Sequence, residues 1–189
     1  SYIDDKIGRI LRTLEDTGMQ ENTVIFFTAD HGDMLGERGM WYKMSFFEWS
    51  ARVPLIVYAP GRYGERRVAA PVSLVDLLPT FLELTGDPHA SEPAAPLDGE
   101  SLVPLLEGGD PGGGKAAERT AGSQTAGRTV ISEYLGEGAL APCFMVRHGS
   151  YKYIHCEADP PQLYDLEADP DELINLAGGS EYEEIEAGL

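Results

Sequence analysis

The residues from Asp30 to Arg52 combine side-chain types that could do chemistry. The segment opens with Asp-His-Gly-Asp, and Lys43 follows amid methionine, tryptophan, tyrosine and phenylalanine. A carboxylate beside an imidazole suits a divalent cation such as Ca, Mn or Zn, and Gly32 would let the backbone approach a ligand closely. A lysine in such surroundings either keeps its ammonium at the surface or holds it in a pocket for an anion. Each feature alone more often marks a capped turn or an ordinary surface residue.

Two short runs of apolar and β-branched residues flank this segment and predict strands. Residues 23–28 (TVIFFT) lead to Asp30 and His31, and residues 53–58 follow Arg52. Continuous apolar runs of this length are typical of strands buried on both faces of a parallel sheet. Open α/β sheets bind ligands beyond the carboxyl ends of their strands, so Asp30 and His31 are expected at a ligand site.

Helices are predicted on either side of these strands. Apolar residues at helical spacing predict an amphipathic helix over residues 3–17. A second helix is predicted over 73–86, with Ser73 as its N-cap and Asp76 in the capping-box position. Pro79 indicates either a kink in this helix or a later helix start. Helix, strand, strand and helix together describe the edge of an α/β sheet.

The composition changes along the chain and predicts three parts. Residues 1–108 are expected to be α/β, with a short helix within 97–108, and residues 109–127, rich in Gly and Ala, to be a flexible loop. Residues 128–189 are expected to form a small α+β subdomain with an antiparallel sheet. Its predicted strands are 129–134, 143–147 and 151–155, with a tight hairpin at 148–150.

The net charge of −18 argues against several classes of partner. A surface this negative repels nucleic acids and anionic lipid headgroups. No apolar run approaches the roughly 20 residues that span a bilayer, so no membrane partner is expected. The 42% of hydrophobic residues is enough to bury a core. The chain opens on Ser rather than Met and stops within an acidic, helix-like stretch, as we expect of a fragment.

The order of residues after Asp-His-Gly is more informative than any one of them. Lys43, Glu48, Arg52 and Pro54 follow at intervals of 5, 4 and 2. This pattern resembles the sulfatase family of the alkaline-phosphatase-like superfamily, and the run from Asp30 to Gly61 resembles its choline-sulfatase branch. The segments LDGESLVPLL and QLYDLEADPDELINLA are also similar to family segments. The likeness covers nearly the whole chain apart from the 109–127 loop.

The resemblance implies a fold, a metal site and a substrate contact. The fold would be the edge of an alkaline-phosphatase-like sandwich, a mostly parallel sheet with helices, followed by a small antiparallel C-terminal sheet. Asp30 and His31 would be ligands of a divalent metal, Ca or Mn, and Lys43 would contact the sulfate oxygens. Sulfate-ester cleavage must hold an anionic group and stabilise charge on the leaving oxygen, and a metal with an ammonium can do both.

One departure from the family concerns the nucleophile. Sulfatases use a formylglycine made from Cys or Ser in a Cys/Ser-x-Pro-x-Arg motif, and neither Cys143 nor Cys156 stands in such a motif. The formylglycine and the remaining metal carboxylates are therefore expected in a missing N-terminal part. The 189 residues alone are expected to be inactive.

Several other residues have roles that the sequence leaves open. Glu133, at the end of a predicted strand, either binds the substrate or is exposed. A quaternary ammonium would need a carboxylate and aromatic faces, for which the candidates are Trp41, Tyr42 and Tyr134. Glu48 and Arg52 are expected to form a structural ion pair behind the site. Cys143 and Cys156 lie on strands that could pair, and buried free thiols are favoured over a disulfide.

The leading hypothesis is the C-terminal portion of a metal-dependent sulfuric ester hydrolase that converts choline-O-sulfate to choline and sulfate. One alternative is a phosphonate monoester or phosphodiester hydrolase of the same superfamily. Another is a truncated, non-catalytic pseudoenzyme. The resemblance further implies a small-molecule sulfate ester as partner, a homo-oligomeric parent, and a cytoplasmic location in a bacterium in preference to a periplasmic one.

Overall fold

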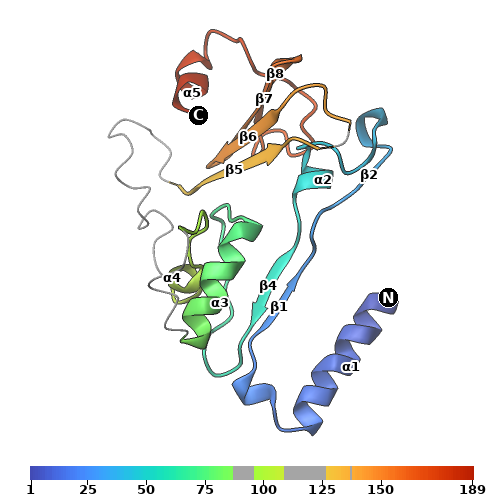
Figure 1. Ribbon diagram of the computed structural model, residues 1–189, viewed down its shortest axis with the longest axis vertical. Helices are drawn as coiled ribbons and strands as arrows, with labels where there is room; N and C mark the ends of the chain where they lie inside the picture. The colour runs from blue at the N-terminus through green and yellow to red at the C-terminus, as the bar shows by residue number, and fades with distance from the viewer. Residues whose placement is uncertain (87–95, 109–126, 137) are drawn as a thin grey trace. The chain divides into compact units, whose positions relative to one another are not determined.

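The computed structural model describes residues 1–86, 96–108, 127–136 and 138–189. They form two compact units, of which the first contains Ser1–Asp30 and Val53–Arg67 and the second contains His31–Arg52 and Val68–Leu189. Their elements are labelled in Figure 1. The predicted 109–127 loop lies outside the described residues except for Gly127, and the three predicted domain ranges remain predictions.

The first unit contains one long helix and one pair of strands. Helix α1 (Tyr2–Asp16) confirms the predicted amphipathic helix, and Ser1 caps it by accepting a hydrogen bond from the Asp4 N–H at 3.2 Å. A 3-10 helix, η1 (Gln20–Asn22), follows. Strands β1 (Ile25–Thr28) and β4 (Leu55–Tyr58) then run antiparallel, side by side along their full length (Figure 1).

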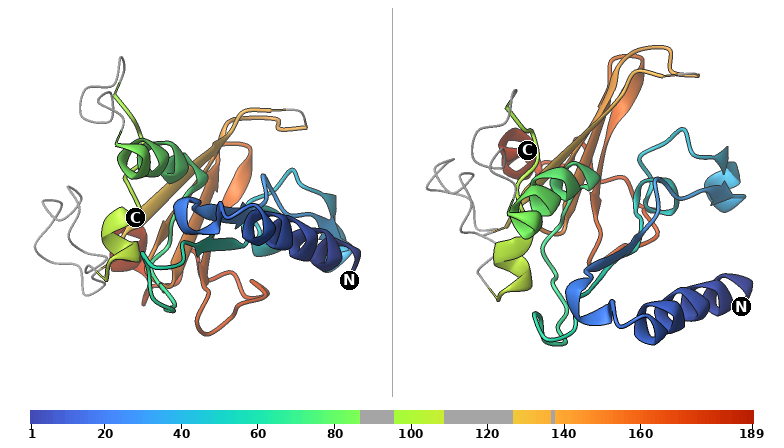
Figure 2. Two further views of the ribbon diagram at one scale, coloured as in Figure 1. Left: turned by 90° about the horizontal axis from the view of Figure 1, so that it is seen from below. Right: turned by 60° about the horizontal axis from the view of Figure 1, so that its bottom comes forward.

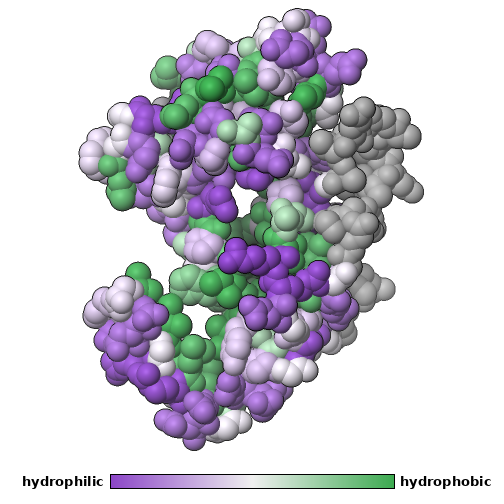
Figure 3. Space-filling model, turned by 180° about the vertical axis from the view of Figure 1, so that it is seen from behind, coloured by the Kyte–Doolittle hydropathy of each residue, from purple (hydrophilic) through white to green (hydrophobic). Residues whose placement is uncertain are grey.

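The pairing of β1 with β4 corrects the expectation of two strands buried in a parallel sheet. No residue of either strand is buried, and Ile56 is 58% exposed. A short apolar run has no periodicity that would distinguish a doubly buried strand from one that is covered in part. Figure 3 shows hydrophobic surface in green among hydrophilic residues. The exposed apolar residues of this unit include Ile3, Ile10, Leu11, Phe27 and Ile56.

Ser73 and Asp76 form the predicted capping box at the start of the second helical region. A 3-10 turn, η3 (Leu74–Asp76), leads into helix α3 (Leu77–Thr85). Pro79 therefore lies in the first turn of α3, where its missing N–H removes no intrahelical hydrogen bond. The later helix start, one of the two predicted possibilities, is confirmed.

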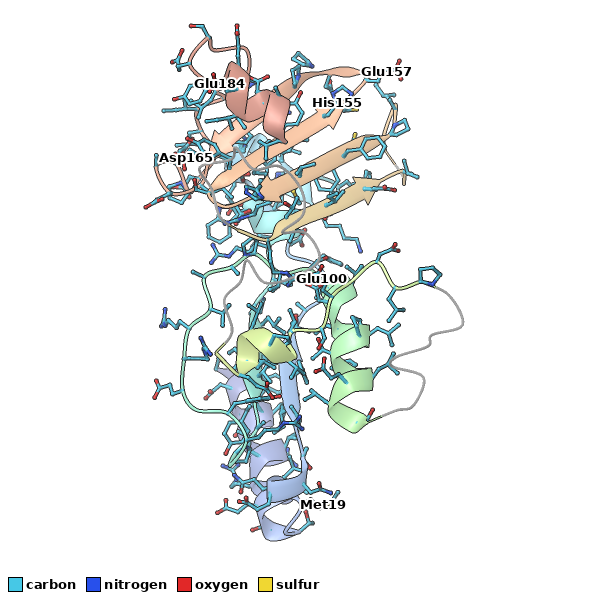
Figure 4. All side chains as sticks on the ribbon, turned by 90° about the vertical axis from the view of Figure 1, so that its left-hand side faces the viewer. Met19, Glu100, His155, Glu157, Asp165 and Glu184 are labelled. Carbon is cyan, nitrogen blue, oxygen red and sulfur yellow. The ribbon has the colours of Figure 1, made fainter. Side chains whose placement is uncertain are left out.

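A buried ion pair ties the segment before helix α4 (Val103–Leu106) to this capping box. The Glu100 N–H donates to Asp76 Oδ1 at 2.9 Å, and the Arg128 guanidinium reaches both carboxylate oxygens of Asp76 at 3.1 Å. Glu100 is labelled in Figure 4. Asp76 is thereby the shared acceptor of a backbone amide and of an arginine, which compensates for its burial.

Four antiparallel strands form the predicted small sheet, in the order β5-β6-β7-β8 (Figure 1), and the sheet is drawn in orange tones in both views of Figure 2. The first three, β5 (Thr129–Tyr134), β6 (Cys143–His148) and β7 (Tyr151–Cys156), confirm the three predicted strands. The turn between β6 and β7 contains Gly149 at φ 57°, a conformation that favours glycine.

Strand β8 (Asp159–Asp165) and helix α5 (Glu183–Gly188) complete the second unit. The sequence does not predict β8, because Pro160 and Pro161 interrupt the strand pattern. In the described residues β8 pairs only with β7, and prolines are tolerated on such an edge strand. None of the helices in the described ranges combines the length and apolar character that crossing a bilayer requires.

The segment from Asp30 to Arg52, here the chemistry-bearing segment, contains only short elements. In chain order they are β2 (Met34–Leu35), η2 (Glu37–Gly39), β3 (Trp41–Tyr42) and α2 (Glu48–Ala51). Met34 and Phe47 from this segment are buried together with Met145, Ile154 and Tyr164 of the four-stranded sheet. The Phe47 and Tyr164 rings meet edge to face, with centroids 6.1 Å apart. The four-stranded sheet is therefore the platform on which the segment is held.

Candidate functional site

His31 and Lys43 meet in the second unit. The Lys43 Nζ lies 2.8 Å from His31 Nε2, and His31 Nδ1 lies 2.6 Å from the Gly32 carbonyl oxygen. A carbonyl can only accept, so Nδ1 carries the proton and Nε2 offers its lone pair to the lysine ammonium. The geometry thus places the imidazole, with its Nδ1 toward a carbonyl, beside the lysine ammonium.

The backbone of Lys43 is held at its carbonyl. The Ser50 hydroxyl donates to the Lys43 carbonyl oxygen at 2.6 Å, and the Ser45 N–H donates to the same oxygen at 2.9 Å. Tyr42, directly before the lysine, has φ 72°, which is unfavourable for an aromatic residue. The Lys43 side chain itself is exposed, so its ammonium is open to an anionic ligand.

Gly32 provides a close approach between two backbones. Its N–H donates to the Ser50 carbonyl at 2.8 Å, and the Asp33 N–H donates to the Trp49 carbonyl at 2.8 Å. A Cβ atom on Gly32 would lie 2.0 Å from the Trp49 oxygen. In the described residues Gly32 therefore allows its backbone to pack against the backbone of residues 49–50. The sequence had instead suggested that the glycine lets the backbone approach a ligand.

We expect Gly32→Ala to destabilise the protein by about 1–3 kcal/mol, the usual range for a forced clash in a packed region. The backbone of Trp49 must move, since no flexible side chain end is available to give way. Guanidinium unfolding of the purified variant measures the loss. Gly188→Ala is the matched control, because a Cβ there meets nothing within 4 Å. Equal stability of the two variants would contradict this reading of Gly32.

Asp30 and His31, the predicted ligands of a divalent metal, are both exposed. Among the residues that the structure describes, no group of three or more His, Cys, Asp or Glu side chains could hold a metal ion. An exposed carboxylate and a neutral imidazole are suitable donors, but hard divalent cations need several more. An ion bound at His31 Nε2 would also have to displace the Lys43 ammonium, which now occupies that lone pair.

Glu48 has more partners than the sequence predicted. The predicted ion pair with Arg52 is present, with Nη1 and Oε2 3.7 Å apart, but Arg52 is exposed and such pairs contribute little. The closer partners are Lys152, whose Nζ is 2.8 Å from Glu48 Oε1, and Arg147 at 3.4 Å. Both come from the four-stranded sheet, so Glu48 links the chemistry-bearing segment to that sheet.

Sequence reasoning did not single out Lys152 or Glu172, which are almost completely buried around Glu48. The Lys152 Nζ is 2.6 Å from Glu172 Oε1. The alternation of side chains along β7 could have indicated that Lys152 is buried. Ile154, two residues further on, is a core residue, and side chains two apart lie on one face of a strand. No comparable local signal exists for Glu172, which lies in a turn.

Glu133 lies on β5, in register with Phe144 of β6, and its side chain is exposed. The chain beyond this strand approaches the lysine segment, since a Cβ on Gly138 would lie 3.5 Å from the Met44 sulfur. The candidate aromatic residues Trp41 and Tyr42 are 62% and 68% exposed. Glu133 therefore remains a predicted substrate contact.

The two cysteines face each other in register across β6 and β7, and both are free thiols. The hydrogen bond with Cys156 and then burial raise the pKa of the Cys143 thiol to about 11. At neutral pH Cys143 is therefore protonated and a poor nucleophile.

His155, labelled in Figure 4, is exposed on β7 opposite Phe144.

Comparison with known proteins finds the same family throughout. The family model described as Sulfatase matches residues 1–87. Choline-sulfatase of Rhizobium meliloti (strain 1021) is 46% identical over 178 residues, which cover 94% of this chain and 31% of that protein. The chain thus spans about a third of the length of such curated relatives.

Solved structures agree on the fold. A protein solved in complex with its substrate D-glucosamine-2-N,6-O-disulfate has a TM-score of 0.76 and 30% identity, covering 99% of this chain and 36% of that one. The phosphonate monoester hydrolase of Agrobacterium radiobacter has a TM-score of 0.74 and 31% identity, covering 98% and 37%. The predicted alkaline-phosphatase-like fold is confirmed by these neighbours.

Proposed function

Because the chain belongs to the sulfatase family, we propose that it is the C-terminal portion of a metal-dependent sulfuric ester hydrolase. The protein of which this chain is such a portion is called the full-length enzyme below. The formylglycine nucleophile and the remaining metal ligands of that enzyme would lie outside these 189 residues.

The contact between Lys43 and His31 is the observation that carries the proposal. It brings an exposed ammonium next to an imidazole nitrogen, which are the types of group needed to hold an anionic ester beside a cation. Lys43 would bind the sulfate oxygens, and Asp30 and His31 would provide two ligands for Ca or Mn. When bound, the ion would supply Lewis-acid stabilisation of the charge that develops in ester cleavage.

Choline-O-sulfate is the proposed substrate. The likeness to choline-sulfatase, 46% identical over nearly the whole chain, supports it. Its cationic end requires a carboxylate and aromatic faces, which the exposed Glu133, Trp41 and Tyr42 could offer. The neighbourhood of Gly138 and Met44 shows that the chain after β5 comes close to the lysine segment, which is consistent with a role for Glu133.

A phosphonate monoester is the second candidate substrate, favoured by the likeness to the hydrolase of Agrobacterium radiobacter. A phosphonate monoester also presents anionic oxygens that a lysine and a divalent cation can hold. The Lys43 and His31 geometry therefore does not discriminate between the two ester classes.

Paired assays of the full-length enzyme on choline-O-sulfate and on a phosphonate monoester, each with Ca or Mn, test the proposal. We expect the higher kcat/KM on the sulfate ester, and no turnover by the 189-residue chain alone, which lacks the nucleophile motif. A higher kcat/KM on the phosphonate monoester would make that ester, and not choline-O-sulfate, the substrate of the enzyme. Absence of both activities in the presence of either metal would contradict the catalytic proposal and favour a non-catalytic module.

A further inference from the structure

Lys152 on β7 carries a fully buried ammonium with three close oxygen partners. Its side chain is 0% exposed. The Nζ donates to the Phe46 carbonyl at 2.7 Å and to Glu48 Oε1 at 2.8 Å, and it lies 2.6 Å from Glu172 Oε1. A lysine ammonium has three N–H groups; two of them donate to Phe46 and Glu48, and the contact with Glu172 is an ion pair. Two of these three oxygen partners belong to the segment that carries Lys43.

The carboxylates around Lys152 are themselves held in place. Glu172 Oε2 accepts the Glu48 backbone N–H at 2.7 Å, and the Glu172 carbonyl accepts a hydrogen bond from Arg38. Arg147 reaches Glu48 at 3.4 Å. Lys152, Arg147 and the exposed Arg52 thus face the carboxylates of Glu48 and Glu172, and a low-dielectric surrounding strengthens the buried contacts.

The backbone on which these contacts act is not held by a long helix or strand. Between β3 and α2 the residues from Lys43 to Phe47 belong to no regular element. Tyr42 and Arg38 nearby have φ of 72° and 56°, and Glu172 has φ 56°. Such left-handed conformations of residues other than glycine persist where the surroundings determine them. The hydrogen bonds to Phe46 and Glu48 are contacts of this kind.

Stability alone does not account for an ionic group at position 152. Well-packed apolar residues often replace a buried ion pair with equal or better stability. An apolar side chain on β7 could not donate to the Phe46 carbonyl or orient Glu48. The contribution specific to the lysine is therefore the geometry of the segment that it binds.

We propose that Lys152 is a positioning residue, which with Glu48 and Glu172 fixes the segment that presents Lys43 to the sulfate group. The inference rests on the proposed role of Lys43. It assigns to the C-terminal sheet a part in the reaction that goes beyond support of the fold.

The test combines Lys152→Met with Glu48→Gln and Glu172→Gln in the full-length enzyme, which removes all three charges together and leaves Arg147, 27% exposed, in contact with water. We expect kcat to fall by about 10²-fold, the size that a 1 Å misplacement can produce. Hydrogen exchange at the amides of residues 43–50 should accelerate in the same variant. Arg128→Met with Asp76→Asn is the matched control, since it removes another buried ion pair of the second unit. The control should keep both kcat and the exchange rates of 43–50.

The outcomes separate this inference from the proposed function. Equal losses of kcat in the two variants, or retention of kcat in the Lys152 variant, overturn the positioning role. If the full-length enzyme cleaves no sulfate ester, hydrogen exchange still tests whether Lys152 restrains the backbone of residues 43–50. Faster exchange there in the Lys152 variant but not in the control supports this restraint, and unchanged exchange overturns it. Should the triple variant fail to fold, Lys152→Arg provides the second test, because a planar guanidinium cannot reproduce the three contacts. A Lys152→Arg enzyme with normal kcat would overturn the proposal.

Discussion

Replacement of Lys43 by alanine is expected to lower kcat of the full-length enzyme by about 10²–10³-fold, the loss typical of one electrostatic donor in an active site. Lys43 would stabilise the charge on the transferring sulfate, whereas its exposed side chain contributes little to packing. The measurement is steady-state kinetics on a sulfate ester, with a thermal melt of the same preparation. The melting temperature should stay close to that of the unmodified enzyme.

Lys6→Ala provides the control for loss of a lysine as such. Lys6 is on α1 in the first unit, paired with Asp5 at 3.7 Å, and its loss should leave kcat unchanged. If Lys43→Ala spares kcat and lowers stability, Lys43 is a structural residue and its assignment to the substrate is wrong.

Replacement of Glu172 by alanine is expected to cost about 3–5 kcal/mol of unfolding free energy, the range for breaking a buried ion pair from one side. Glu172 is 1% exposed. Its loss would remove one of the two carboxylates around the fully buried Lys152 and leave the Glu48 N–H without its acceptor. Denaturant unfolding of the purified protein measures the difference.

Asp171→Ala is the neighbouring control, because Asp171 is exposed and surface substitutions usually stay within about 0.5 kcal/mol. A Glu172→Ala protein as stable as the Asp171→Ala protein would show that water or a rearranged side chain compensates for the missing carboxylate.

The elements that local signals specify could be predicted from the sequence. Helix α1 followed from apolar spacing, and the capping box at Ser73 followed from the residue types that cap helices. The three strands β5, β6 and β7 followed from short apolar runs and a turn. Strand β8 was missed since its prolines are acceptable only on an edge, and edge position depends on the rest of the sheet. The antiparallel pairing of β1 and β4 was missed because an apolar run does not specify strand direction.

The candidate site, too, could be predicted from the sequence only in part. Lys43 and His31 were singled out from their order along the chain, and the structure brings them together. The surroundings of Glu48 were not predictable, because its partners Lys152 and Glu172 lie 104 and 124 residues further along the chain. Such pairings depend on tertiary packing, which local periodicity does not report.

The separation between Glu48 and Glu172 also has a consequence during synthesis. A ribosome adds about 5–20 residues per second, so Glu172 emerges roughly 6–25 s after Glu48 has left the exit tunnel. Throughout that interval the lysine segment exists without Glu172, which accepts the Glu48 N–H. The part of the chain that we assign to substrate binding would thus acquire its final conformation among the last, and a chain released before residue 172 would carry Lys43 and His31 without their support.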